Sequence, residues 1–358
     1  MNNITTRNFG LDLFRALAIL LVVLSHGKFL LNGTVLENFP YVKMLDGVDL
    51  FFVLSGFLIG GILLKSSSEE LNWRDVAHFW KRRWLRTLPN YYLILLLNFI
   101  FVSCGIISGD LAVVGWKFIV FLQNFTKPLI GFFWESWSLA VEEWFYIFTP
   151  VLLWLLLKKF KLKVSFLIVT LLLMIGPMLY RAYSFDATLD DFWFDVKVRK
   201  IVVLRLDAIA FGLLLAWIYY FHKNLWDKWK NVALVLGLGM VLFLLNYGAS
   251  NATFYRQVFY FSITPLAIAL VLPWFEGITS SWKRLVGVVT HFSKISYSMY
   301  LINLALVAQV IGLNFPVTGN ADGIMKYVAY WFIVITVSSA LYHFVERPIL
   351  RWRDDASR

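Results

Sequence analysis

The chain has 358 residues, of which 60% are hydrophobic and 15% charged, whereas a soluble domain carries about 25% charged residues. This composition excludes an ordinary soluble enzyme and indicates a polytopic membrane protein. The net charge of +11 does not indicate a nucleic-acid partner, because the Lys and Arg residues are split among short loops between apolar segments. The single cysteine, Cys104, excludes an internal disulfide and most thiolate metal sites, and we expect no metal.

The apolar segments predict an all-α fold. Each is close to the ~20 residues that cross a bilayer, and ten are expected, at 12–31, 47–65, 88–109, 137–157, 164–181, 201–221, 231–248, 257–275, 295–314 and 325–345. The short segment 113–123 is expected to be re-entrant or interfacial. The hypothesis is a polytopic membrane helical bundle of about ten transmembrane helices, with residues 1–358 as one domain.

The distribution of basic residues predicts the orientation. With the N-terminus in the cytoplasm, the regions on that side hold roughly twice as many Lys and Arg residues as those outside, as the positive-inside rule requires. An even number of spans puts both termini on the same side. We therefore expect both termini to be cytoplasmic.

The first segment, LDLFRALAILLVVLSHGKFLL, contains Arg15 and His26. Ionisable groups at membrane depth cost free energy and usually mark function. Their separation by 11 residues corresponds to about 1100° of helix rotation, which leaves the side chains about 20° apart and roughly 16 Å apart along the axis. One helix face therefore carries a cation near the cytoplasm and a proton-transfer group toward the outside.

The predicted topology sorts the other polar residues into two groups. The outer group offers a histidine, whose pKa suits proton transfer, and carboxylates that can orient it. Its members are His26, Asp49, Ser138, Glu142, Glu143, Arg205 and Asp207. The inner group is a set of guanidinium groups suited to phosphate recognition: Arg15, Arg82, Arg83 and Arg86.

Simpler interpretations stay open for several of these residues. His26 alone suits an interhelical hydrogen bond, and the basic residues at 81–86 suit a purely topogenic role. Asp49 suits a helix N-terminus. Arg205 and Asp207 suit structural ion pairs with other spans. The glycines of the second segment, Gly56, Gly60 and Gly61, are typical of close helix packing.

Six motifs in order along the chain resemble the acyltransferase-3 family of integral membrane acyltransferases. They are GLDLFRALAILLVVLSH, GVDLFFVLSGFLIGGIL, the Arg-x-x-Arg of Arg83 and Arg86, WSLAVEEWFY, ISYSMYLIN and VERPILRW. The resemblance covers essentially the full chain. One departure is Asn303, which stands where relatives often have histidine. Many relatives append an extracytoplasmic SGNH esterase-like domain, and we expect this chain to be a stand-alone form without it.

The resemblance implies transfer of an acyl group, usually acetyl, from cytoplasmic acyl-CoA to a hydroxyl of an extracytoplasmic glycan or glycolipid. It implies a multi-pass protein of the bacterial inner (cytoplasmic) membrane. The acceptors expected are lipopolysaccharide O-antigen, capsule or exopolysaccharide, with peptidoglycan also open. It implies a catalytic His26, assisted by Glu142, and a donor site at Arg83 and Arg86. The residues themselves add Asp49 as an alternative partner that would orient His26 or balance its charge.

The residues themselves suggest how these groups would work. Acetyl-CoA is the expected donor, held by Arg83, Arg86 and Arg15, and His26 is the expected general base on the sugar hydroxyl or, alternatively, a covalent acyl carrier. Acceptor-binding roles are expected for Ser138, Glu143, Arg205 and Asp207. The alternatives are a transporter of acylated or glycosylated material, although no repeated halves are visible, and a non-catalytic membrane partner subunit.

Overall fold

The computed structural model describes residues 7–38, 46–66, 71–247 and 252–355, and every regular element within those ranges is helical. Nine helical segments in them are long and apolar enough to cross a membrane, and Leu206–Phe221 is a shorter apolar helix. The prediction of an all-α bundle with about ten spans is therefore confirmed. The final residue of the predicted segment 231–248 lies outside the described residues.

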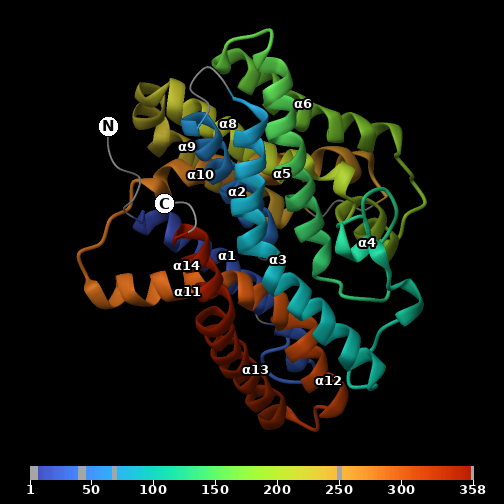
Figure 1. Ribbon diagram of the computed structural model, residues 1–358. Helices are drawn as coiled ribbons and strands as arrows, with labels where there is room; N and C mark the ends of the chain where they lie inside the picture. The colour runs from blue at the N-terminus through green and yellow to red at the C-terminus, as the bar shows by residue number, and fades with distance from the viewer. Residues whose placement is uncertain (1–6, 39–45, 67–70, 248–251, 356–358) are drawn as a thin grey trace.

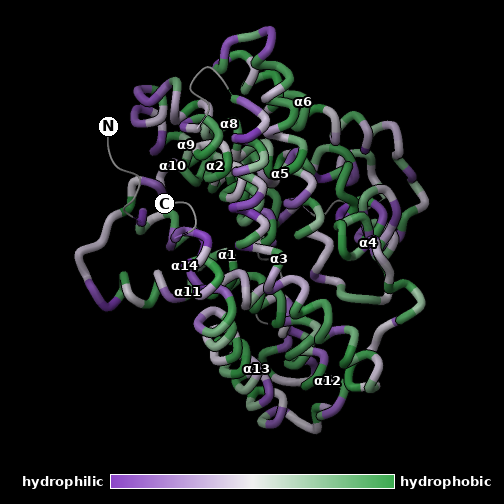
Figure 2. The backbone as a smooth tube through the Cα atoms, viewed as in Figure 1, coloured by the Kyte–Doolittle hydropathy of each residue, from purple (hydrophilic) through white to green (hydrophobic). Residues whose placement is uncertain are grey.

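The long helices follow one another along the chain, with longer connections between α3 and α5 and between α6 and α8 (Figure 1). They are α1 (Phe9–Gly27), α2 (Gly47–Ser66), α3 (Trp73–Ser103), α5 (Ser136–Leu157), α6 (Leu162–Tyr183), α8 (Leu206–Phe221), α9 (Lys223–Asn246), α10 (Tyr260–Glu276), α11 (Lys283–Ile302) and α13 (Asn320–Leu341). Short helices complete the chain: α4 (Trp116–Ile119), α7 (Asp191–Phe194), α12 (Val310–Asn314) and α14 (Arg347–Asp355). Figure 2 shows hydrophobic residues along the long helices and hydrophilic residues concentrated at helix ends and in connections.

Turns of π-helix interrupt the regular hydrogen bonding at four places. They are η4 (Asp195–Arg199), η6 (Tyr255–Phe259), η7 (Asn303–Gln309) and η8 (Tyr342–Glu346). Such turns are rare in proteins, and those that occur are often found at functional sites. Two of them, η7 and η8, follow α11 and α13 and change the direction of side chains at the end of each helix.

The third span begins earlier than predicted. The predicted segment is 88–109, whereas α3 runs from Trp73 to Ser103 and contains Pro89. Its start is fixed by a capping box, in which the Asn72 side chain accepts from the backbone of Asp75 and the Asp75 side chain accepts from the backbone of Asn72. The basic residues at 81–86 are therefore part of the spanning helix itself.

The segment 113–123 contains only the short helix α4 and a 3-10 turn, so it is too short to cross the bilayer, as predicted.

Close packing of α2 against α8 is made possible by glycine. A Cβ on Gly56 would lie 1.9 Å from the carbonyl oxygen of Ile209, and one on Gly212 would lie 2.2 Å from that of Val53. A Cβ on Gly60 would meet Ala216 at 2.5 Å, whereas one on Gly61 would meet nothing within 4 Å. The predicted packing role is confirmed for Gly56 and Gly60.

One end of the bundle collects the start of α1 and the ends of neighbouring helices. The Asn8 side chain donates to the carbonyl oxygen of Glu276 at the end of α10 (2.9 Å), and Arg7 donates to Ser293 of α11 (3.2 Å). Arg82 near the start of α3 forms a salt bridge with Asp354 of α14 (3.2 Å). This end is the one that the basic residues predict to face the cytoplasm.

Candidate active site

A cavity of about 730 Å³ lies among α1, α2, α3, α5, α8, α10 and α11. Its polar lining includes Arg15, Ser55, Arg83, Arg86, Thr87, Ser138, Glu142, Tyr146, Ser296, Tyr297 and Tyr300. Apolar side chains of α2, including Phe51, Leu54 and Leu58, line another part of it. The cavity therefore combines convergent polar groups with an apolar wall, as small-molecule sites do.

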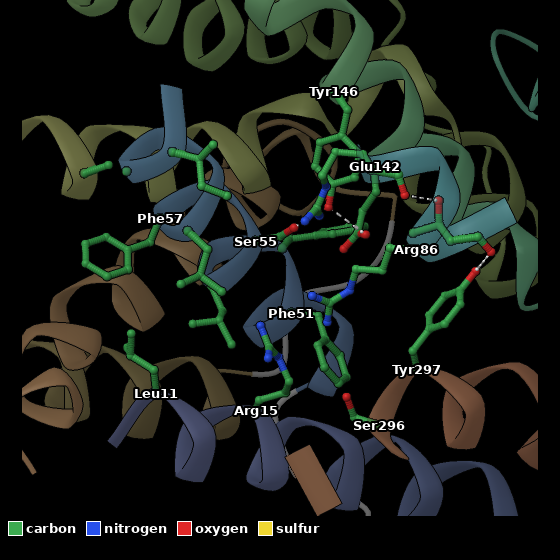
Figure 3. Close-up of a pocket in the computed structure, with 18 of the residues that line it drawn as sticks. Leu11, Arg15, Phe51, Ser55, Phe57, Arg86, Glu142, Tyr146, Ser296 and Tyr297 are labelled. Carbon is green, nitrogen blue, oxygen red and sulfur yellow. Dashed lines mark hydrogen bonds between the residues drawn. The ribbon is translucent and has the colours of Figure 1, made fainter. Parts of the chain in front are cut away.

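The three arginines predicted to bind the donor converge on this cavity. Figure 3 shows the guanidinium groups of Arg15 on α1 and Arg86 on α3 pointing into the same space. Arg83 also lines the cavity, and its guanidinium lies over the Tyr146 ring at 4.5 Å. Within the described part of the chain, none of the three forms a salt bridge. Guanidinium groups free of a carboxylate partner are suited to bind phosphate.

A short hydrogen-bonded wall faces the arginines. The Tyr146 hydroxyl donates to Glu142 Oε2 (3.0 Å) and also contacts the Ser55 hydroxyl (2.5 Å) (Figure 3). Glu143 faces away from Glu142 and accepts from Thr87 (2.8 Å). The two adjacent glutamates therefore have different partners, and neither contacts His26 by a hydrogen bond in the described chain.

One end of the cavity is lined by Ser138, near the start of α5, and by Tyr300, near the end of α11. Their hydroxyls are 2.6 Å apart, and the Tyr300 hydroxyl donates to the backbone carbonyl of Glu135 (3.0 Å). Both residues line the cavity, whereas His26 is absent from its lining. The His26 imidazole therefore does not line the cavity in this structure.

His26 is held by Asn303, the first residue of the π-helical turn η7. The imidazole Nδ1 lies 2.6 Å from Asn303 Oδ1. The Asn303 amide nitrogen donates to the carbonyl oxygens of Met299 (2.9 Å) and Tyr300 (2.8 Å). The side chain of Asn303 is fully buried, and His26 is half-buried.

This arrangement fixes the tautomer of the neutral imidazole. Because both amide protons of Asn303 are used by backbone carbonyls, its oxygen faces His26 and can only accept. Nδ1 must therefore carry the proton, and Nε2 keeps a lone pair for a reacting hydroxyl. The predicted orientation of His26 by Glu142 or Asp49 is not what the structure contains, since a neutral amide occupies that place.

The remaining residues of the outer group form buried ion pairs. Asp49 contacts Arg205, and Asp207 is paired with Arg181 through two hydrogen bonds of 3.1 and 2.7 Å. Arg205 and Asp207 are 1% and 0% exposed. The prediction that Arg205 and Asp207 form structural ion pairs with other spans is thus confirmed: their partners are Asp49 and Arg181. Their burial leaves no surface for the predicted contact with an acceptor.

A second ionic cluster lies just outside the spans. Arg199 contacts both Asp46 and Asp195, and Lys200 also contacts Asp195 (2.5 Å). Burial alone would raise the pKa of the Asp46 carboxyl, but the adjacent Arg199 guanidinium holds that pKa below its usual value. The cluster ties the connection before α2 to the π-helical turn η4.

Three residues of the site were not predicted as functional. Asn303 was noted only as a departure from histidine, while Tyr300 and Tyr146 were not singled out. Tyr146 follows Glu142 by one helical turn, a spacing that brings side chains together. The contact of Asn303 with His26 joins residues 277 positions apart, and no pattern along the chain indicates it.

Known proteins resemble this chain over most of its length. A putative O-acetyltransferase of Staphylococcus aureus (strain COL) is 31% identical over 96% of the chain and 58% of its own length. The putative peptidoglycan O-acetyltransferase YrhL of Bacillus subtilis (strain 168) is 28% identical over 95% of the chain and 54% of its own. The O-acetyltransferase OatA of S. aureus (strain NCTC 8325 / PS 47) is 25% identical over 95% and 57%.

The chain thus spans a little more than half the length of these relatives. No solved structure matches it. The Acyl_transf_3 family model, described as an acyltransferase domain, matches residues 8–343, a range that contains His26, Arg83, Arg86 and Glu142. This multi-pass membrane chain therefore belongs to the acyltransferase-3 family.

Proposed function

We propose that the protein is a membrane-bound O-acetyltransferase that moves an acetyl group from acetyl-CoA to a glycan hydroxyl outside the cytoplasmic membrane of a bacterium. One observation carries the proposal. Arg15, Arg83 and Arg86 line one cavity and form no salt bridges in the described chain. Tyr300 lines the same cavity and is three residues from Asn303, which holds His26. Family membership supports the reaction class.

The donor site is assigned to the arginines. The phosphates of acetyl-CoA bind to Arg15, Arg83 and Arg86, and the pantetheine arm lies along the apolar wall formed by Phe51, Leu54 and Leu58. The rise along α1 from Arg15 to His26 is roughly 16 Å, which an extended pantetheine arm can span. The thioester then reaches the region of Ser138 and Tyr300.

The acyl transfer is assigned to His26. Nε2 accepts the proton of the glycan hydroxyl while the hydroxyl oxygen attacks the thioester carbonyl carbon. The carbon–sulfur bond then breaks, and the thiolate of coenzyme A takes the proton from the imidazolium. The Asn303 oxygen accepts a hydrogen bond from Nδ1–H throughout, so the ring keeps its orientation. A covalent acyl-histidine is the alternative route, in which Nε2 itself attacks the thioester.

Access from the cavity to His26 requires side-chain movement at the end that Ser138 and Tyr300 line. Ser138 and Tyr300 line the cavity with their hydroxyls 2.6 Å apart, whereas His26 does not line it. We propose that rotation of the Tyr300 side chain opens this path when the donor is bound. Ser138 then faces the reacting groups, while Glu142 stays with the arginines and balances their charge.

The acceptor is assigned by class only. The name of the Bacillus relative contains peptidoglycan, so peptidoglycan joins lipopolysaccharide O-antigen, capsule and exopolysaccharide as a glycan to be tested. Residues 1–358 are proposed to act as one transmembrane acyltransferase domain, with both termini in the cytoplasm.

Incubation of the purified protein in proteoliposomes with acetyl-CoA carrying a labelled acetyl group tests this function. We expect release of free coenzyme A and transfer of label to an added glycan acceptor. Binding of the glycan with no consumption of acetyl-CoA would support a transporter instead. Activity that appears only with a separate catalytic chain would support a partner subunit.

A further inference from the structure

A second cavity lies between α11 and the end of α13, away from the candidate active site. It has a volume of about 660 Å³ and is lined by Ser280, Ser281, Lys283, Val286, Gly287, Thr290, His291, Lys294, Tyr342, His343 and Arg347. It shares no lining residue with the first cavity. The acetyl transfer proposed above does not use it.

The charges of this cavity are of one sign. Lys283, Lys294 and Arg347 contribute three cationic groups, and no carboxylate is among the lining residues. Within the described chain none of the three cations forms a salt bridge. The acid next to Arg347 in sequence, Glu346, is 4% exposed and is hydrogen-bonded to Asn90 and Ser298 instead.

Two of these cations share one face of α11, roughly 16 Å apart along its axis. Lys283 and Lys294 are 11 residues apart and so lie on nearly the same helix face. Figure 1 shows the first half of α11 extending away from the bundle, and both lysines are exposed. On the opposite side of the cavity, η8 presents His343, and α14 begins with Arg347.

Exposed apolar residues are sequence neighbours of the residues that line the cationic cavity. Phe344 is 83% exposed, Trp282 64% and Val288 55%. These residues adjoin His343, Lys283 and Gly287 in sequence. A soluble anion would contact only the cations and hydroxyls, whereas a phospholipid would also cover the apolar side chains with its acyl chains.

We infer that this cavity binds the headgroup of an anionic phospholipid, with its phosphate between Lys294 and Arg347. The cavity lies at the end of the bundle that the basic residues predict to be cytoplasmic, since Arg7 donates to Ser293, the neighbour of Lys294. Basic pockets between transmembrane helices on that side are suited to bind anionic headgroups. The Thr290 hydroxyl supplies a further donor, whereas His291 is hydrogen-bonded to Ser339 (3.1 Å).

Native mass spectrometry of the full chain, titrated with dioleoyl phosphatidylglycerol or dioleoyl phosphatidylcholine, tests this inference. The variant Lys294→Gln/Arg347→Gln removes two charges from the cavity, and Lys159→Gln/Lys161→Gln removes two from the exposed connection between α5 and α6. We expect the first variant to bind phosphatidylglycerol roughly tenfold or more weakly, a change of about 1.4 kcal/mol, because Lys294 and Arg347 line the cavity whereas Lys159 and Lys161 do not. The second variant should match the original protein, and none should prefer phosphatidylcholine.

Equal binding of phosphatidylglycerol by the original protein and the cavity variant would overturn the inference. So would displacement of the lipid by equimolar inorganic phosphate or by coenzyme A, because the cavity would then be a site for a soluble phosphate. The conservative variant Lys294→Arg should keep lipid binding, which separates loss of charge from misfolding. None of these outcomes depends on acetyl transfer.

Discussion

The imidazole Nδ1 of His26 lies 2.6 Å from Oδ1 of Asn303, and both amide protons of Asn303 are donated to backbone carbonyls of α11. A neutral amide thus takes the place that a carboxylate holds in a Ser-His-Asp triad. An amide oxygen orients the ring and fixes its tautomer, but it stabilises the imidazolium less than a carboxylate would. The base in this site is therefore tuned by orientation more than by charge.

Replacement of Asn303 should impair catalysis rather than donor binding. Asn303→Ala removes the acceptor for Nδ1–H, so the tautomer with a free Nε2 is no longer enforced. We expect kcat to fall by about ten- to hundredfold, part of the 10²–10⁴ that a general base supplies, with KM for acetyl-CoA little changed. The pH dependence of kcat should also shift, because the imidazole loses its hydrogen-bond partner.

Asn314→Ala is the matched control for that change. Asn314 also donates to two backbone carbonyls, those of Ile106 and Val310, but it is exposed at the end of α12. Its substitution should leave kcat unaltered. An Asn303→Ala enzyme with the original kcat and pH profile would show that Asn303 does not position His26.

Substitution of Arg86 should weaken the donor specifically. Arg86→Gln removes a guanidinium that lines the cavity without a salt bridge in the described residues. A hydrogen bond to a charged group contributes about 1.5–3 kcal/mol, so KM for acetyl-CoA should rise by about ten- to hundredfold. The measurement is initial rate against acetyl-CoA concentration.

Arg82→Gln provides the comparison on the same helix. Arg82 points to Asp354 in a salt bridge whose members are 40% and 54% exposed, and it does not line the cavity. Its loss should leave KM for acetyl-CoA little changed, because Arg82 does not line the cavity and an exposed ion pair contributes only ~0–1 kcal/mol to stability. If both substitutions raised KM equally, the basic residues would act through general charge rather than through the cavity.

The α2–α8 contact should be intolerant of a methyl group. Gly56→Ala would place a Cβ 1.9 Å from the Ile209 carbonyl oxygen, which forces the two helices apart and should cost about 1–3 kcal/mol. We expect a lower melting temperature in detergent, measured by tryptophan fluorescence. Gly176→Ala in α6, where a Cβ meets nothing within 4 Å, should melt like the original protein. Equal melting of the two variants would contradict the packing described here.

Glu135 should make stability depend on pH. Burial raises the pKa of its carboxyl to about 7 from an ordinary 4.5, against the opposing effects of the Ala305 backbone N–H and of Lys200. Between pH 4.5 and 7 the folded state holds a proton that the unfolded state has released, so stability decreases as pH rises through this window and levels off above it.

A Glu135→Gln variant tests that pH dependence. Glutamine keeps an acceptor for the Ala305 N–H, which lies 2.6 Å from Glu135 Oε1, but it does not titrate. Melting curves between pH 5 and 8 should show a decline in the original protein that is reduced in the variant. A parallel decline in both would assign the effect to other groups.

The sequence predicted the fold through patterns that are local. Hydrophobic length determines spans because a helix needs a fixed number of residues to cross the bilayer, and the glycines of α2 indicate close packing. The start of α3 was misplaced because its capping box precedes a polar first half that hydropathy alone does not identify as part of a spanning helix. Pro89 did not end that helix.

The site was only half predictable for a related reason. Arg83 and Arg86 share a helix face, and the predicted topology places Arg15 on the same cytoplasmic side, so their convergence could be anticipated from two short segments. The partner of His26 could not, because residue type favours a carboxylate while the tertiary fold brings Asn303 to Nδ1. Likewise, Asp49 and Arg205 lie 156 positions apart, and only the packing of α2 against the start of α8 reveals that they neutralise each other.

Transfer of labelled acetyl from acetyl-CoA by a His26→Ala variant, purified and compared with the original protein in proteoliposomes, tests the central claim most directly. The substituted side chain is half-buried, so the variant should elute and melt like a folded protein and should bind acetyl-CoA through its intact arginines. We predict that transfer to the glycan falls to background. A folded His26→Ala protein that acetylates the glycan at the original rate would contradict the account.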